Sequence, residues 1–161
     1  MIRELREQDW EAVAGLLAAF RVHLRALKGL SSEANRNEAR EELAEFVRQG
    51  APIFVAEVGG QVMAYMVLRQ ADELVWVEQL YVAKAARRRG LASALFDRAE
   101  ALARLKGEET VYNYIHPNNE EVIGFLRARG YTVVNLVEIR KAYAGEKLTQ
   151  EIPVGNHFFD Y

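Results

Sequence analysis

A basic loop in the middle of the chain carries the residue types of an anion-binding site. An apolar strand, Leu74–Val82, runs into it, and the loop ends in Arg87-Arg88-Arg89-Gly90 just before a helix expected over Leu91–Lys106. The start of a helix exposes unpaired backbone N–H groups at the positive end of the helix dipole. Gly90 lets the backbone approach a ligand because it has no Cβ, and Ala92 keeps the first turn open. The pattern therefore predicts a site for a diphosphate.

The alternative is a solvated basic loop that happens to precede a helix. Spacing alone does not separate the two interpretations, because short glycine motifs have many false matches. The loop is not a P-loop, since no Gly-Lys-Ser/Thr follows. It is not a dinucleotide-binding turn either, because that turn needs three glycines and only Gly90 is present here.

Composition limits the function classes. The 161 residues are 50% hydrophobic and 27% charged, which is typical of one globular domain. With a net charge of -2 we expect binding neither to nucleic acid nor to a membrane surface. The chain has no cysteine, which excludes disulfides and thiolate chemistry and suits a cytoplasmic protein. No apolar run approaches the roughly 20 residues of a membrane span, and no His/Asp/Glu spacing suggests a metal site.

The elements that must position the loop follow from apolar periodicity. Repeats at three and four residues predict four helices, and β-rich runs predict the strands, with Gly59-Gly60 as a hairpin turn. The expected helices are 10–27, 37–49, 91–106 and 119–129, and the expected strands are 1–6, 52–58, 61–69, 74–82, 110–115 and 131–141. The order predicts an α/β sheet in which the strands on either side of the 91–106 helix run parallel. The tail, residues 142–161, can add a final strand.

At the basic loop the sequence resembles the GNAT superfamily of N-acetyltransferases, whose signature Arg/Gln-x-x-Gly-x-Gly/Ala corresponds here to Arg87-x-x-Gly90-x-Ala92. Other weak motifs follow in the family's order over residues 1 to about 141: Ile2-Arg3 with Asp9, the hairpin Val55–Ala64, the strand Val77–Val82, and Asn119 to Gly130-Tyr131. The resemblance implies a single domain over 1–161 whose mixed, mostly antiparallel sheet has six or seven strands, with about four helices on both faces. A homodimer is an expectation on family grounds only.

The resemblance also implies an activity and a set of coenzyme contacts. It implies an enzyme that moves an acetyl group from acetyl-CoA to a primary amine of a small molecule or peptide by direct attack. Strand and loop backbone should hold the coenzyme's pantetheine arm and pyrophosphate, and Asn119 should contact the arm or shape its slot. The implied residues are Leu80, Tyr81, Val82, Arg87, Arg88, Arg89, Gly90, Leu91, Ala92 and Asn119. The alternative for Asn119 is a plain helix N-cap.

For catalysis, Glu78 is the candidate base, and the alternative is a strand glutamate paired with an arginine. The family commonly has a general-acid tyrosine where this sequence has Leu126, which can donate nothing. Tyr114 is the candidate replacement, while Tyr81, another tyrosine or water remain alternatives. The alternative function for the chain is a non-catalytic domain that binds acyl-CoA as a sensor or interaction domain, and Leu126 favours it. Glu78 and the Gly90 loop favour the enzyme.

Overall fold

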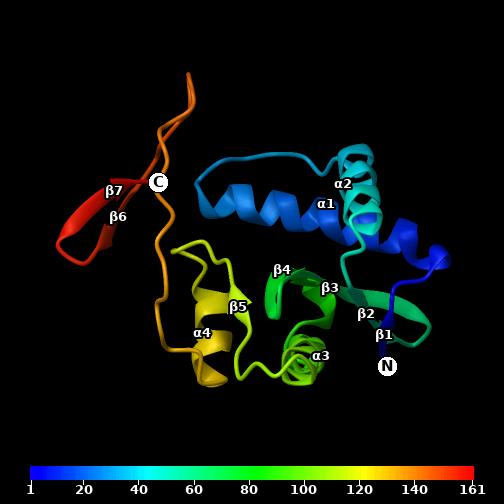
Figure 1. Ribbon diagram of the computed structural model, residues 1–161. Coiled ribbons are helices and arrows are strands. Elements are labelled where there is room, and N and C mark those ends of the chain that lie inside the picture. The colour runs from blue at the N-terminus through cyan, green and yellow to red at the C-terminus, as the bar shows by residue number, and fades with distance from the viewer. The chain divides into compact units, whose positions relative to one another are not determined.

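The computed structural model describes residues 1–161, which form two compact units. The first unit holds residues 1–22 and 33–114, and the second holds residues 23–32 and 115–161. Figure 1 labels the elements of both units. Helix α1 (Trp10–Leu27) begins in the first unit and ends in the second.

The first unit is a five-stranded sheet with helices. Its strands are β1 (Ile2–Glu4), β2 (Ile53–Val58), β3 (Gln61–Ala71), β4 (Leu74–Val82) and β5 (Tyr112–Asn113). They lie in the order β1-β2-β3-β4-β5. The first four are antiparallel neighbours, and β5 is parallel to β4. The α/β class and the mixed, mostly antiparallel sheet predicted from the sequence are confirmed.

Helices cover both faces of this sheet. Tyr65 and Val67 of β3 join a buried cluster with α1 and with α2 (Arg36–Arg48). The alternate positions of β3, Ala64, Met66 and Leu68, are also fully buried, because α3 (Leu91–Leu105) packs against β2, β3 and β4. Figure 1 shows α3 on the opposite side of the strands from α2. Burial on both faces explains why the strand sequences are apolar at almost every position.

The second unit contains α4 (Glu120–Ala128) and a hairpin of β6 (Glu151–Val154) and β7 (His157–Asp160). Side chains from 115–161 bind the backbone at the end of α1. Thr149 donates to the Lys28 carbonyl at 2.6 Å, and Asn118 donates to the Leu27 carbonyl. The His116 ring and the Tyr161 hydroxyl form a further hydrogen bond in this unit.

The predicted strand count is wrong in one place. Residues 131–141 form no strand, so the main sheet has five strands, and the tail forms two strands that pair only with each other. Val133, Val134 and Leu136 are 87%, 83% and 85% exposed. A β-rich run becomes a strand only where another strand completes its hydrogen bonds, and this segment has no such neighbour.

No helix of this protein combines the length and the apolar character that crossing a bilayer requires.

Candidate active site

Strand β4 contains an irregularity at Glu78. Val67 of β3 pairs with Gln79, whereas the next residue, Leu68, pairs with Val77. Glu78 is therefore an extra residue on β4, as in a β-bulge. Such bulges interrupt the regular ladder and redirect a side chain, and they are frequent beside active sites. The bulge separates Glu78 from the regular pairing of its neighbours.

Strands β4 and β5 part directly before Glu78. Their parallel pairing consists of Trp76 with Tyr112 and Val77 with Asn113. From Glu78 to Val82, β4 has a partner strand only on the side of β3. Backbone groups on the other edge of this segment are thus available to an extended ligand, in the way that a sheet edge accepts an added strand.

The residues predicted to line this edge differ in what they expose. Leu80 and Val82 are half-buried, whereas Tyr81 is buried, with its ring 6.0 Å from the ring of Phe20. The Tyr81 side chain therefore belongs to the core, and its main chain faces Tyr65 of β3, so only Leu80 and Val82 present backbone groups to the open edge.

The loop after β4 has an unusual backbone. After a 3-10 turn at Lys84–Ala86, Arg88 has φ +61°, a left-handed conformation that non-glycine residues seldom adopt, and Gly90 has φ +77°. Such strain in non-glycine residues clusters at functional sites. The backbone N–H groups of Arg88, Arg89 and Gly90 make no hydrogen bond to other backbone groups. The next amides belong to the first turn of α3, where no intrahelical acceptor exists.

The loop is open to solvent at two of its arginines and at Gly90. Arg88, Arg89 and Gly90 are exposed, and a Cβ at position 90 would stand in open space with no heavy atom within 4 Å. The structure therefore leaves open space beside Gly90. Arg87 differs from its neighbours, because its Nε donates to the Val82 carbonyl at 3.3 Å and its guanidinium lies over the Tyr81 ring.

One arginine brings the two predicted catalytic residues together. Arg69 of β3 donates from Nε to Oε2 of Glu78 at 3.2 Å and from Nη2 to the hydroxyl of Tyr114 at 3.0 Å. The glutamate–arginine pair foreseen as the alternative for Glu78 is therefore present. Oε2 makes that contact, and the Glu78 side chain remains 33% exposed. A carboxylate in this setting can still bind a water molecule or an amine.

A buried polar chain beside the bulge was missed in the sequence. The Tyr65 hydroxyl donates to Gln79 Oε1 at 2.9 Å, and Gln79 Nε2 donates to Glu42 of α2 at 2.6 Å. Arg21 of α1 also binds the Glu42 carboxylate. The available signal was Gln79 itself, a polar residue inside an otherwise apolar strand.

The remaining predicted residues lie in the second unit. Asn119 is buried and caps α4, accepting a hydrogen bond from the Val122 N–H at 3.4 Å. The capping role named as its alternative is therefore real, and its contact with a coenzyme stays a prediction. Leu126 is 4% exposed, as expected of an apolar residue on the inner side of a helix.

Comparisons with known proteins give one family match and several similar solved structures. Residues 10–131 match the model of the acetyltransferase (GNAT) family. No curated protein matches the sequence. Among solved structures, the chain is similar to the ribosomal-protein-alanine N-acetyltransferase of Brucella melitensis biovar Abortus 2308, with a TM-score of 0.69 and 17% identity, covering 89% of this chain and 99% of that one.

Two further structures show the same fold. The PaiA N-acetyltransferase of Thermoplasma acidophilum, solved in complex with coenzyme A, gives a TM-score of 0.68 at 17% identity, over 80% of this chain and 87% of that one. The aminoglycoside antibiotic 6'-N-acetyltransferase of Acinetobacter haemolyticus gives 0.65 at 18% identity, over 89% and 98%.

Proposed function

The chain belongs to the acetyltransferase (GNAT) family, and on that premise we propose how its own residues move an acetyl group from acetyl-CoA to an amine. When bound, acetyl-CoA supplies an activated acetyl group as a thioester. The protein must therefore bind the coenzyme, orient the thioester and accept a proton from the amine. Each task has a candidate in the first unit.

The loop before α3 binds the pyrophosphate. The main-chain N–H groups from Arg88 to Ala92 donate to its oxygens, and the Arg88 and Arg89 side chains add positive charge. Gly90 keeps the approach open because it lacks a Cβ. Arg87 contributes by holding the end of β4 through its contact with the Val82 carbonyl.

The open edge of β4 binds the pantetheine arm. Main-chain groups of Leu80 and Val82 pair with the amide groups of the arm where β5 no longer occupies that edge, whereas the main chain of Tyr81, between them, faces β3. A backbone N–H in this stretch then points at the thioester carbonyl and polarises it. Asn119 remains a candidate for contacting the same arm from the start of α4.

Glu78 and Tyr114 carry the proton transfers. Glu78 accepts the proton of the attacking amine, directly or through water, and Tyr114 donates a proton to the leaving thiolate. Direct attack needs no nucleophile from the protein, in keeping with a chain that has no cysteine. The observation that carries the proposal is the position of both residues immediately after the last paired residues of β4 and β5.

The acceptor is proposed to be a primary amine on a small molecule or a peptide. Two of the similar structures are named for acceptors of both kinds, an alanine of a ribosomal protein and an aminoglycoside. A cytoplasmic location and a homodimer remain proposals from composition and family.

Two measurements on the purified protein test this function. Acetyl-CoA should raise the melting temperature, and a free-thiol assay should detect coenzyme A release with at least one amine of a panel. The panel should contain amino acids, polyamines, aminoglycosides and short peptides. A melting temperature that rises without thiol release on any amine would instead favour the acyl-CoA sensor.

A further inference from the structure

We propose that Arg69 is a positioning residue that holds Glu78 and Tyr114 in the geometry needed for acetyl transfer; this rests on the function proposed above. No sequence motif points to Arg69. It lies nine residues before Glu78 and 45 before Tyr114. The fold alone brings the three side chains together.

The guanidinium of Arg69 uses two of its edges at once. Nε binds the Glu78 carboxylate at 3.2 Å, and Nη2 binds the Tyr114 hydroxyl at 3.0 Å. Its carbon also lies 4.1 Å from the centre of the Trp76 ring and 5.5 Å from that of Tyr114. Two aromatic contacts and two hydrogen bonds therefore restrict the orientation of the group.

These contacts matter because the residues they hold lack other restraints. Glu78 is the extra residue of the bulge, and Tyr114 follows the last paired residue of β5. Their side chains are 33% and 60% exposed. Arg69 lies on β3 within the stretch Ala64–Ala71 that pairs with β4, so it gives both side chains a fixed reference point.

An arginine suits this role better than a lysine. Its planar guanidinium presents several donors in a fixed relation, so it can bind two groups in one plane. A lysine has a single nitrogen and cannot reproduce the Nε and Nη2 contacts together. The other surface arginine pairs of the first unit, such as Arg48 with Glu45, bind only groups with no proposed part in the reaction.

A double-mutant cycle with Glu78 tests the proposal. The wild type, Arg69→Gln, Glu78→Gln and the double variant are compared by kcat and by KM for acetyl-CoA, using an amine that the wild type acetylates. Arg69→Gln should lower kcat about tenfold, because small misplacements of reacting groups are costly. KM for acetyl-CoA should stay within about twofold, since the coenzyme contacts lie elsewhere. In the Glu78→Gln background the same change should lower kcat by a smaller factor, because only the contact with Tyr114 is then left to lose.

Two companion variants separate positioning from folding. Arg69→Lys keeps the positive charge and the apolar stem, and it should remain well below the wild-type kcat. Arg48→Gln breaks an exposed ion pair within α2 and should leave kcat unchanged. Melting temperatures of all variants show whether any of them has lost its fold, and Arg69→Lys gives the answer if Arg69→Gln does not fold.

Several outcomes would overturn the inference. An unchanged kcat in Arg69→Gln, an equal loss in the two Glu78 backgrounds, or a kcat of Arg69→Lys equal to the wild type would each show that Arg69 does not act through Glu78. Those outcomes leave the acetyltransferase function intact. A wild type that acetylates no amine would overturn the proposed function and the role of Arg69 with it.

Discussion

Gln79 donates a hydrogen bond from its side-chain amide to the carboxylate of Glu42 at 2.6 Å and so joins β4 to α2 beside the bulge. The other end of the same amide accepts from the Tyr65 hydroxyl at 2.9 Å. Burial raises the pKa of Tyr65 well above its ordinary value, and the Glu42 charge acts in the same direction. Tyr65 therefore keeps its proton and remains a donor over the physiological pH range.

Removing that donor should destabilise the protein. Tyr65→Phe leaves the buried oxygen of Gln79 without a partner, and we expect a loss of about 1–3 kcal/mol in the free energy of unfolding. Urea unfolding followed by circular dichroism measures the loss. Tyr143→Phe, at a residue that is 71% exposed, is the matched control and should cost nearly nothing. Equal stability of the two variants would show that the Tyr65–Gln79 bond contributes little.

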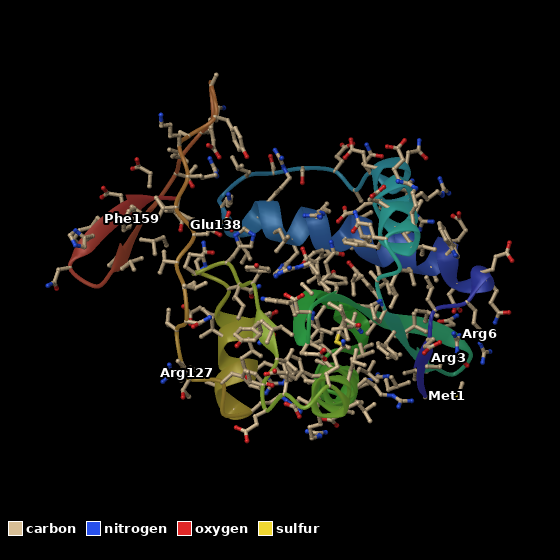
Figure 2. All side chains as sticks on the ribbon, in the orientation of Figure 1. Met1, Arg3, Arg6, Arg127, Glu138 and Phe159 are labelled. Carbon is tan, nitrogen blue, oxygen red and sulfur yellow. The ribbon has the colours of Figure 1, made fainter.

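The start of the chain contains a pH-sensitive contact. Figure 2 shows Arg3 on β1 and Arg6 in the segment that leads into α1. Arg3 binds both carboxylate oxygens of Asp9, at 2.6 and 2.9 Å, and the Arg6 N–H donates to Asp9 at 2.8 Å. The hydrogen bonds from Arg3 lower the pKa of Asp9 below its ordinary value, although burial opposes them.

A carboxyl whose pKa is lowered by folding stabilises the protein above its unfolded pKa, which is about 4 for aspartate. The contribution is lost as the pH falls through the lower, folded value. We expect Asp9→Asn to be less stable than the wild type at pH 7, and the difference in urea midpoint to shrink as the pH is lowered below about 4. A difference that stays constant down to the acid transition would contradict this account.

Much of the fold followed from periodicity and turn chemistry. The helices and the strands β2 to β4 lie within about two residues of their predicted ends, because each has a clear apolar face or run bounded by turn residues. Gly59 and Gly60 both have positive φ, as the predicted hairpin turn requires. The Gly90 loop was visible for the same reason, since its chemistry is local in sequence.

Features that depend on distant partners were not visible. A bulge is defined by which residues pair across two strands, so the run Leu74–Val82 by itself does not reveal the one at Glu78. The contacts of Arg69 with Glu78 and Tyr114 arise only when β3, β4 and β5 meet. The segment 131–141 shows the converse error, because its sequence suits a strand but no neighbouring strand pairs with it.

The Gly90 loop can be tested against a matched glycine. Gly90 and Gly50 have φ of +77° and +69°, and a Cβ would meet no heavy atom within 4 Å at either site. Alanine should therefore cost about 1–2 kcal/mol of stability at both positions, from left-handed backbone strain. Only Gly90→Ala should weaken binding of coenzyme A, by about tenfold or more, as measured by calorimetry. Equal affinities of the two variants would remove Gly90 from the coenzyme site.

The role of Glu78 as base predicts a loss of rate without a loss of binding. Glu78→Gln keeps the size of the side chain but cannot accept the proton, so kcat should fall by about 100-fold or more. The affinity for coenzyme A, measured in the same way, should hardly change. The control is Glu73→Gln in the β3–β4 turn, where the side chain is 70% exposed. Full activity of Glu78→Gln would leave the base unidentified and turn attention to water.

Tyr114 is the proposed proton donor, in place of the tyrosine that the family commonly has where this chain has Leu126. Its oxygen accepts from Arg69 at 3.0 Å, which leaves its own O–H to donate to a leaving thiolate. Tyr114→Phe keeps the ring over Arg69 but removes that proton, and we expect kcat to fall by roughly 10- to 100-fold.

The comparison residue for this prediction is Tyr112 of β5, two positions earlier in the chain. Its ring centre lies 5.4 Å from that of Trp76, and Tyr112→Phe preserves the contact. This variant should keep nearly the wild-type rate. If both phenylalanine variants lose the same small fraction of activity, the tyrosines serve packing only. With an amine substrate for which release of the thiolate limits the rate, the wild type should then show a solvent isotope effect. Tyr114→Phe should show the same effect, because water would be the proton donor in both proteins.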